Sequence, residues 1–398
     1  MKKTIRDYDL NNKKVIIRCD LNVPIKGQLI LDDNRIIQSL ETIKYAQENG
    51  AKVIILSHLG RVKTEEDKKD KSLYIVSKRL SELLNNEVKF INETRGSVLE
   101  NEINNMKPKE VILIENTRFE DYPNKKESTN DEELGKYWAS LGDIFINDAF
   151  ATSHRNHASN VGIATYLPSG IGFLVEKELK MLGETLNSPK RPYTVIMGGS
   201  KINDKIKVVD KLFEKADYVL LAGGIANTFL KAKGYELGKS IYDEESISYV
   251  NELMKKYNEK IVLPIDGYGS ISYQDGIDVT YMDIDNVKED LMLLDVGKKT
   301  VELFKEYINK SKTVFWNGPV GVSEFKNFEF GTKSIGEVLK NSNAIVVVGG
   351  GDTAGSLIRF GYKNDFAHIS TGGGASLEFI EGKTLPGISM ISEKENEK

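Results

Sequence analysis

Short runs of apolar and β-branched residues recur along the chain and alternate with longer stretches that carry apolar residues at helical spacing. The predicted strands are Val15–Ile17, Val53–Leu56, Val111–Ile114, Ile144–Ile146, Thr194–Met197, Tyr218–Leu221, Ile261–Leu263, Thr313–Phe315 and Ile345–Val348. Helices are predicted between them, for example over Asn34–Asn49, Ser72–Leu84 and Ile202–Lys215. Because strands that alternate with helices form parallel sheets, the pattern predicts an α/β fold. Two such sheets fit a length of 398 residues.

The stretch 167–192 is the candidate domain boundary. Five apolar residues recur in it at helical spacing: Phe173, Leu174, Leu179, Leu182 and Leu186. Pro189 and Pro192 then favour the end of the helix. We interpret the stretch as a helix at 173–187 that joins a domain at 1–172 to a second domain. A helix that lies wholly inside one domain would show the same pattern.

Composition restricts the classes of function. The net charge of −4 and the pI near 5.8 argue against a nucleic-acid partner, because such proteins normally carry a basic surface. The single cysteine, Cys19, excludes an internal disulfide and fits a reducing compartment. The start MKKTIRDYDLNNKK lacks the apolar region of a signal peptide, and no run is long enough to span a membrane. We therefore expect a cytoplasmic protein without a membrane partner.

Arginine is distributed unevenly between the two halves of the chain. Eight arginines precede residue 160 and two follow it: Arg6, Arg18, Arg35, Arg61, Arg79, Arg95, Arg118 and Arg155, then Arg191 and Arg359. Several lie where a predicted strand gives way to a loop, and the carboxyl ends of parallel strands meet at one sheet edge. Since the guanidinium fork matches carboxylate and phosphate oxygens, we predict a site for a small polyanion in the first half. Any single arginine could instead form an ordinary surface ion pair.

The second half repeats a different pattern, in which an apolar strand is followed by two or three glycines and a helix start. The pattern occurs in YTVIMGGSKINDKI, YVLLAGGIANTFL, AIVVVGGGDTAGSL and FAHISTGGGASLEF. Glycine lets the backbone approach a ligand closely, and a helix N-terminus offers free N–H groups with partial positive charge. Four such turns at one edge predict a polyphosphate groove, although any single turn could be structural.

Two lysines and a carboxylate accompany these turns. Lys201 and Lys205 lie four residues apart at the predicted opening of their helix, so we expect them to share a face. Asp352 follows three glycines, in a position from which a carboxylate could hold Mg²⁺ against phosphates. A helix N-cap is the alternative role for Asp352.

The motifs, in this order, resemble the phosphoglycerate kinase family over nearly the whole chain. They are RCDLNVP (Arg18–Pro24), SHLGR (Ser57–Arg61), ENTRF (Glu115–Phe119), NDAF (Asn147–Phe150), HRNHAS (His154–Ser159), GGSKINDKI (Gly198–Ile206), FWNGPVGV (Phe315–Val322), GGGDTA (Gly349–Ala354) and STGGGASLE (Ser370–Glu378). The combination is highly specific, whereas none of the motifs would be specific alone.

The resemblance implies two doubly wound parallel-sheet (Rossmann-like) domains that flank a cleft and are joined by an interdomain helix. The domain at 1–172 would bind 3-phosphoglycerate, the domain at 188–380 would bind the nucleotide, and the segment 381–398 would return to the first domain. The implied reaction is reversible, Mg²⁺-dependent phosphoryl transfer from 1,3-bisphosphoglycerate to ADP, which gives 3-phosphoglycerate and ATP by direct in-line transfer after hinge closure. The partners would be these small molecules, and we expect a monomer.

The resemblance also implies roles for individual residues that match the motifs. The glycerate would be bound by Asp20, Asn22, Arg35, His58, Leu59, Gly60, Arg61, Arg118 and Arg155. The nucleotide would be bound by Lys201, Lys205, Gly224, Asn317, Glu324, Gly350, Gly351, Asp352 and Thr353, with Glu324 at the ribose and Asp352 at the magnesium ion. Our hypothesis is that Arg35 and Lys201 stabilise the transferring phosphoryl group, with backbone amides at Gly372 and Gly373.

The chain departs from the family pattern in three places. Val62 stands where proline is usual, and Ser323 stands where phenylalanine is usual before Glu324. The segment LPIDGYGSISYQ (Leu263–Gln274) also differs from the usual continuation after its strand. The departures after residue 262 concern the region where the base and ribose are approached, so they leave the nucleotide preference open.

Two other interpretations of the sequence remain open. Gly349–Ala354 fits the dinucleotide fingerprint G-x-G-x-x-A, which would indicate a nicotinamide-dependent oxidoreductase. That fingerprint needs an acidic residue about 20 positions further on, and Asp365 comes early. The third interpretation is a non-catalytic binding protein with the same fold, although Arg35, Lys201 and Asp352 argue against a loss of turnover.

Overall fold

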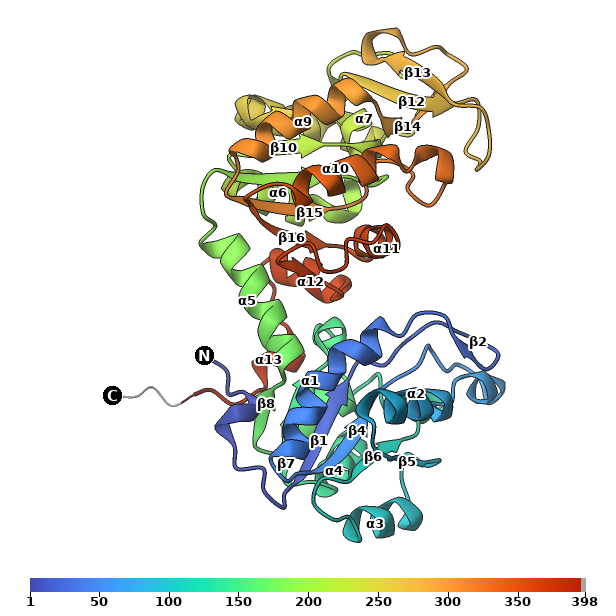
Figure 1. The fold of residues 1–398 in the computed structure, drawn as a ribbon, viewed down its shortest axis with the longest axis vertical. Coiled ribbons are helices and arrows are strands. Elements are labelled where there is room, and N and C mark those ends of the chain that lie inside the picture. Colours follow the sequence, from blue (N-terminus) through green and yellow to red (C-terminus); the bar gives the residue numbers. More distant parts are fainter. Residues whose placement is uncertain (395–398) are drawn as a thin grey trace. The chain divides into compact units, whose positions relative to one another are not determined.

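The computed structural model describes residues 1–394 and divides into two compact units (Figure 1). Unit 1 comprises residues 1–179 together with the chain from 383 onward, and unit 2 comprises residues 180–382. The division falls within helix α5 (Phe173–Asn187), which covers the helix expected at 173–187. The last four residues of the terminal segment expected at 381–398 lie outside the described residues.

Unit 1 contains a six-stranded parallel sheet in the order β5-β6-β4-β1-β7-β8. Its strands are β1 (Lys14–Cys19), β4 (Lys52–Leu56), β5 (Val88–Ile91), β6 (Val111–Ile114), β7 (Ile144–Asp148) and β8 (Ser169–Ile171). The strands that apolar runs predicted in this half are confirmed. β5 and β8 were not predicted, because Lys89 interrupts the first and the second reads Ser-Gly-Ile.

Helices of the same unit connect or follow these strands, and a two-stranded hairpin lies outside the sheet. The helices are α1 (Asn34–Glu48), α2 (Tyr74–Leu84), α3 (Ser97–Asn104), α4 (Glu132–Ser140) and α13 (Pro386–Ser389), and the hairpin is β2 (Ile25–Lys26) with β3 (Leu29–Ile30). Apolar residues of α1, α2 and the strands form one buried core. Trp138 of α4 is fully buried and donates from Nε1 to the Thr94 carbonyl at 2.9 Å. Residue 394 lies beside the start of the chain on this unit, where its amide donates to the Met1 carbonyl at 2.7 Å.

Unit 2 contains a second six-stranded parallel sheet in the order β11-β10-β9-β15-β16-β17. Its strands are β9 (Tyr193–Met197), β10 (Tyr218–Leu221), β11 (Ile261–Val262), β15 (Thr313–Asn317), β16 (Ile345–Gly349) and β17 (His368–Ile369). Trp316 of β15 is fully buried and donates from Nε1 to the Gly318 carbonyl at 2.7 Å. The prediction of two parallel α/β sheets is therefore confirmed.

Unit 2 also contains a three-stranded antiparallel sheet that the sequence did not predict. It is formed by β13 (Thr280–Asp283), β12 (Asp266–Ser270) and β14 (Met292–Val296), in that order. The central strand β12 reads DGYGS, and its two glycines weaken a strand signal. Both glycines are needed here, since a Cβ at Gly269 would lie 2.1 Å from the Met292 carbonyl oxygen.

The helices of unit 2 follow the strands as expected, with one correction. They are α6 (Ile206–Lys215), α7 (Gly223–Ala232), α8 (Ile247–Tyr257), α9 (Lys298–Lys310), α10 (Phe330–Lys340), α11 (Gly351–Arg359) and α12 (Gly374–Ile380). Lys201 precedes the 3₁₀ turn Asn203–Lys205 and α6, so the prediction that Lys201 and Lys205 share a helix face is wrong. Lys205 has φ −128°, which breaks helical geometry, and the Asn203 amide is held by Asp243 Oδ2 at 3.0 Å.

Each parallel sheet reverses its winding direction beside its first strand. β1 lies between β4 and β7, and β9 lies between β10 and β15. Open α/β sheets bind ligands beside the carboxyl ends of the strands at such a reversal. No helix within residues 1–394 has both the length and the apolar character needed to cross a membrane.

Candidate active site

The residues expected to bind the glycerate come from four neighbouring strands of unit 1, in the order β6-β4-β1-β7, and from α1. Asp20 and Asn22 follow β1, His58 to Arg61 follow β4, Arg118 follows β6, Arg155 follows β7, and Arg35 lies in the first turn of α1. Because the strands are parallel, these loops leave the same edge of the sheet. The loops that carry these arginines therefore lie at one edge of the sheet, as expected.

Hydrogen bonds join several of these residues directly. Arg35 forms an ion pair with Asp20, which is buried. Asn22 Oδ1 accepts a hydrogen bond from the Gly60 amide at 2.9 Å. The Leu59 amide donates to Asn116 Oδ1 at 3.1 Å, and the side chain of Asn116, which the sequence analysis did not name, also donates to the Leu59 carbonyl at 2.8 Å. Asn116 thus holds the loop after β4 in place.

Three further arginines, Arg118, Arg61 and Arg155, differ in whether their side chains are buried and hydrogen-bonded. Arg118 donates to Asp121 Oδ2 at 2.8 Å, whereas its buried Nε lacks a hydrogen-bond partner among residues 1–394. Arg61 and Arg155 are exposed, and the backbone carbonyl of each accepts a hydrogen bond from a neighbouring side chain. A buried guanidinium donor without a partner favours an anionic ligand at this edge.

His58 is buried beside these arginines and is neutral. Its Nδ1 lies 3.2 Å from Arg18 Nη2, and because a guanidinium can only donate, Nδ1 accepts and the proton is on Nε2. Burial and the nearby guanidinium groups of Arg18, Arg118 and Arg35 hold the pKa of His58 well below its usual value. His58 therefore offers a hydrogen-bond donor without adding a charge.

Arg18 has a different role from the one expected of a strand-end cation. It is fully buried, and it donates to Ser159 Oγ at 2.9 Å and to the Cys19 carbonyl at 2.5 Å, in addition to His58. Ser159 Oγ donates in turn to Glu127 Oε1 at 2.5 Å. Burial lowers the pKa of Arg18 and raises the pKa of Glu127, while each charge partly offsets the cost of the other. The sequence signal for this buried network was a charged residue inside an apolar run.

His157 makes this unit sensitive to acid, and we expect His157→Gln to remove part of that sensitivity. Burial, followed by Arg118, Arg18, Arg155 and His154, lowers the pKa of His157 to about 3. The folded protein therefore keeps His157 neutral while the unfolded chain gains a proton below about pH 6.5, so folding stability falls as the pH falls. The variant should regain roughly 1.4 kcal/mol per pH unit relative to the parent between pH 6 and pH 4.

Urea unfolding of both proteins in the same series of buffers measures this difference. Groups with raised pKa, such as Asp148 with a pKa of about 7, act in the opposite direction but cancel in the comparison. Equal pH slopes for the two proteins would contradict a neutral, buried His157.

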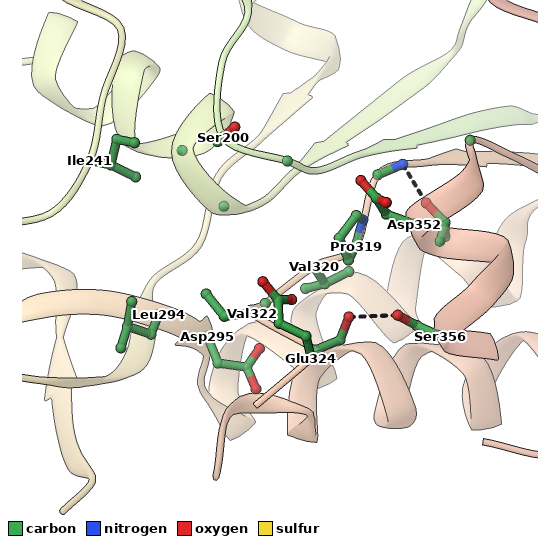
Figure 2. Close-up of a pocket in the computed structure, with 18 of the residues that line it drawn as sticks. Ser200, Ile241, Leu294, Asp295, Pro319, Val320, Val322, Glu324, Asp352 and Ser356 are labelled. Carbon is green, nitrogen blue, oxygen red and sulfur yellow. Dashed lines mark hydrogen bonds between the residues drawn. The ribbon is translucent and has the colours of Figure 1, made fainter. Parts of the chain in front are cut away.

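Unit 2 contains a cavity of about 1250 Å³ at the carboxyl ends of its parallel strands (Figure 2). All four glycine turns line it, through Gly199, Gly223 with Gly224, Gly350 with Gly351, and Gly373 with Gly374. The prediction that the four turns surround one groove is therefore confirmed. Such a volume is larger than that of most small-molecule sites, which are typically about 300–1,000 Å³.

The turns at Gly198 and Gly350 require glycine for different reasons. A Cβ at Gly198 would lie 1.9 Å from the Pro319 carbonyl oxygen, so the loops after β9 and β15 approach one another too closely for any side chain. Gly350 has φ +89° and is the N-cap of α11. The Gly318 amide donates to Thr353 Oγ1 at 2.8 Å and fixes the loop after β15 against this helix.

The carboxylate and the lysines expected at the phosphates line the same cavity. Asp352 is the second residue of α11, and since Gly350 is the N-cap, the alternative role of Asp352 as N-cap is wrong. Lys201 is exposed, and Lys205 Nζ lies 3.4 Å from Asn317 Oδ1. Asn317 Nδ2 is a buried donor that lacks a partner among residues 1–394. An anion in the cavity would accept from this donor and would lie beside positively charged lysines.

Only part of the last glycine turn, Gly372–Gly374, lines the cavity. Gly373 and Gly374 line the cavity, and Gly373, with φ +52°, is the N-cap of α12. Gly372 is absent from the described lining, and its amide donates to Ser370 Oγ at 3.2 Å. In this structure the amide of Gly372 is thus already used.

The other end of the cavity is more apolar and contains two carboxylates. Figure 2 shows Glu324 and Asp295 near Leu294, Val320 and Val322. Glu324 Oε1 accepts a hydrogen bond from the Tyr273 hydroxyl at 2.7 Å. Asp295 accepts from the backbone amides of Val296 and Gly331, each at 2.8 Å, and burial raises its pKa to about 8.

The departure at Ser323 is accommodated by polar contacts. Its Oγ lies 2.8 Å from Ser356 Oγ, both side chains are buried, and its carbonyl accepts a hydrogen bond from Arg359. Tyr273 and Asp295 were not named by the sequence analysis. Asp295 had a weak signal as a charged residue within the apolar stretch LLDV, whereas Tyr273 lay within the departing segment Leu263–Gln274 but was not singled out.

Arginines that converge at one doubly wound sheet and a glycine-lined cavity at another are the features of a kinase that acts on small molecules. A family model described as phosphoglycerate kinase matches residues 5–383. The chain belongs to the phosphoglycerate kinase family, and it is an enzyme of the kinase class.

Individual proteins show the same relationship over the full chain. A phosphoglycerate kinase from Fusobacterium nucleatum is 54% identical over 398 residues, which is 99% of this chain and 100% of that protein. One from Enterococcus faecalis is 54% identical over 395 residues, with the same coverage. The structure of phosphoglycerate kinase from Coxiella burnetii has a TM-score of 0.87 at 39% identity, and the one from Pyrococcus horikoshii OT3 has 0.84 at 33%; each comparison covers 98% of both chains.

Proposed function

We propose that the protein transfers a phosphoryl group reversibly from 1,3-bisphosphoglycerate to ADP, giving 3-phosphoglycerate and ATP. The observation that carries the proposal is the cavity of unit 2, which all four glycine turns line together with Lys201, Lys205 and Asp352. A dinucleotide fingerprint at Gly349–Ala354 alone would not account for the other three turns. It would also leave the arginines of unit 1 without a role.

Unit 1 supplies the site for the glycerate substrate in this proposal. The glycerate and its phosphate are bound by Asp20, Asn22, Arg35, His58, Leu59, Gly60, Arg61, Arg118 and Arg155. Two observations support an anion here: the partnerless Nε of Arg118 and the neutral donor of His58. At this edge the positive charge comes from the arginines, and His58 adds a neutral hydrogen-bond donor.

Unit 2 supplies the nucleotide site. The phosphates lie against Lys201, Lys205, Gly224, Asn317, Gly350, Gly351 and Thr353, and Glu324 accepts hydrogen bonds from the ribose. The partnerless amide nitrogen of Asn317 supports a phosphate oxygen nearby. The apolar walls formed by Ile241, Leu294, Val320 and Val322 suit a base.

Asp352 would hold the Mg²⁺ that accompanies the nucleotide. Asp352 is the carboxylate of the cavity lining that directly follows the glycine turn at Gly350 and Gly351. That donor set fits Mg²⁺, which commonly binds through one or two carboxylates plus substrate phosphates and water. The bound ion would supply charge neutralisation at the phosphates.

The residues of the chain need to provide positioning and charge stabilisation but little proton chemistry. An acyl phosphate leaves behind a carboxylate, which is already a good leaving group, so no general base is required. Arg35 and Lys201 stabilise the transferring phosphoryl group, and the turn at Gly372 and Gly373 adds backbone N–H groups once the Gly372 amide is released from Ser370. Direct in-line transfer requires the two substrates to meet, and hinge closure brings them together.

A coupled assay with 3-phosphoglycerate and MgATP tests the proposed function. Formation of 1,3-bisphosphoglycerate, followed through reduction by an auxiliary dehydrogenase and NADH, is the expected result. Binding of both substrates without turnover would instead support the non-catalytic interpretation. Hydride transfer by the purified protein alone would support the oxidoreductase.

A further inference from the structure

Tyr273 connects the antiparallel sheet of unit 2 to the nucleoside end of the cavity. It follows β12 by three residues and lines the same cavity as Glu324. Its hydroxyl donates to Glu324 Oε1 at 2.7 Å. Burial, together with the Glu324 carboxylate, raises the pKa of Tyr273 to about 12, so the hydroxyl remains a donor at neutral pH.

Additional contacts hold the loop of Tyr273 against the segment that carries Glu324. The rings of Tyr273 and Phe325 have centroids 4.8 Å apart and are inclined at 58°. Asn327 Nδ2 donates to the Ile277 carbonyl at 2.7 Å, and Ser270 Oγ donates to the Ser272 carbonyl at 2.6 Å. The loop is therefore fixed on both sides of Tyr273, although Tyr273 itself is 58% exposed.

We infer that Tyr273 is a positioning residue for the nucleotide, because it engages Oε1 of Glu324 and leaves Oε2 to accept from the ribose hydroxyls. This inference rests on the proposed function, in which Glu324 contacts the ribose. A glutamate side chain at the mouth of a cavity would otherwise sample several rotamers, and the tyrosine hydrogen bond reduces that freedom before the ligand binds. Tyr273 acts through Glu324 and not on the reacting phosphates.

The first test compares Tyr273→Phe with the parent enzyme. The variant keeps the ring and its packing on Phe325 but loses the hydroxyl, so KM for MgATP should rise roughly three- to tenfold. Neither kcat nor KM for 3-phosphoglycerate should change, because the phosphate contacts are untouched. Tyr281→Phe is the matched control: Tyr281 lies in the same small sheet, its hydroxyl donates to Asp283 Oδ1 at 3.2 Å, and it is absent from the described lining.

The second test uses 2′,3′-dideoxy-ATP, which lacks both ribose hydroxyls. If Tyr273 acts through the contact between Glu324 and the ribose, Tyr273→Phe raises KM for ATP but leaves KM for the dideoxy nucleotide at the value of the parent. A purely structural role would raise both values equally. Equal increases would therefore overturn the inference.

Glu324→Gln separates a failure of the inference from a failure of the proposed function. If Glu324→Gln raises KM for ATP and Tyr273→Phe does not, the ribose contact stands and the role of Tyr273 is overturned. If neither variant changes KM for ATP while the parent still turns over, the proposed ribose contact fails and the inference fails with it. A rise in both variants that is less than additive in the double variant is the result that supports the inference.

Discussion

Replacement of Arg35 by alanine is expected to lower kcat by about 100-fold or more, with a smaller change in KM for the nucleotide. Arg35 is the predicted cation at the transferring phosphoryl group, and loss of one well-placed electrostatic donor typically costs about 10²–10³ in rate. Its side chain is 35% exposed and is oriented by an ion pair with Asp20, so it is accessible to a ligand. Steady-state kinetics with both substrates varied measure the effect.

Arg79→Ala is the matched control for this variant. Arg79 is another arginine of unit 1 and is 38% exposed. It forms ion pairs with Asp33 and Glu82 and is not among the residues proposed to bind a ligand. We expect it to leave kcat unchanged. Near-normal turnover of Arg35→Ala would remove Arg35 from the mechanism, provided that thermal unfolding shows both variants to be folded.

Replacement of Arg18 by methionine is expected to cost about 3–5 kcal/mol of unfolding free energy, although Arg18 is not expected to touch a substrate. The reason is that Glu127, which is fully buried, would lose the guanidinium that reaches it through Ser159, and a buried charge without its partner is strongly destabilising. His58 would also lose the donor to its Nδ1. Such a loss is a large fraction of the roughly 5–15 kcal/mol that stabilises a typical protein.

Urea unfolding of Arg18→Met and of the double variant Arg18→Met/Glu127→Gln measures this prediction. Neutralising Glu127 in the double variant removes the uncompensated charge and should restore part of the stability. An unchanged unfolding midpoint in Arg18→Met would show that the buried network contributes little.

The fold was largely predictable because its signals are local. Val15–Ile17 and Thr194–Met197 read as buried parallel strands from their own residues, and both are confirmed. The antiparallel sheet was not predictable, because β12 depends on Gly267 and Gly269 to let its neighbours approach. The start of α6 was predicted too early, since the break at Lys205 and the contact from Asn203 to Asp243 are not encoded by helical spacing.

The candidate sites also contain some features that the sequence predicts and others that it does not. The glycine turns share a cavity because topology brings their strands together, and topology follows from the repeated pattern. By contrast, the burial of Arg18 depends on Glu127 and Ser159, which lie more than 100 residues further along the chain. The contact between Tyr273 and Glu324 likewise joins residues 51 apart. One segment can show that a residue is unusual, but it does not identify the partner, which is fixed only in the folded chain.

The two tryptophans of the chain give each unit its own optical reporter. Trp138 belongs to unit 1 and Trp316 to unit 2, and both are fully buried. The indole of Trp316 is hydrogen-bonded to the carbonyl of Gly318, which lines the cavity proposed to bind the nucleotide, so its emission should change if a nucleotide binds there. With Trp316→Phe only Trp138 emits, and with Trp138→Phe only Trp316 emits. Fluorescence can therefore follow the unfolding of one half of the enzyme and the loading of the other without an added label.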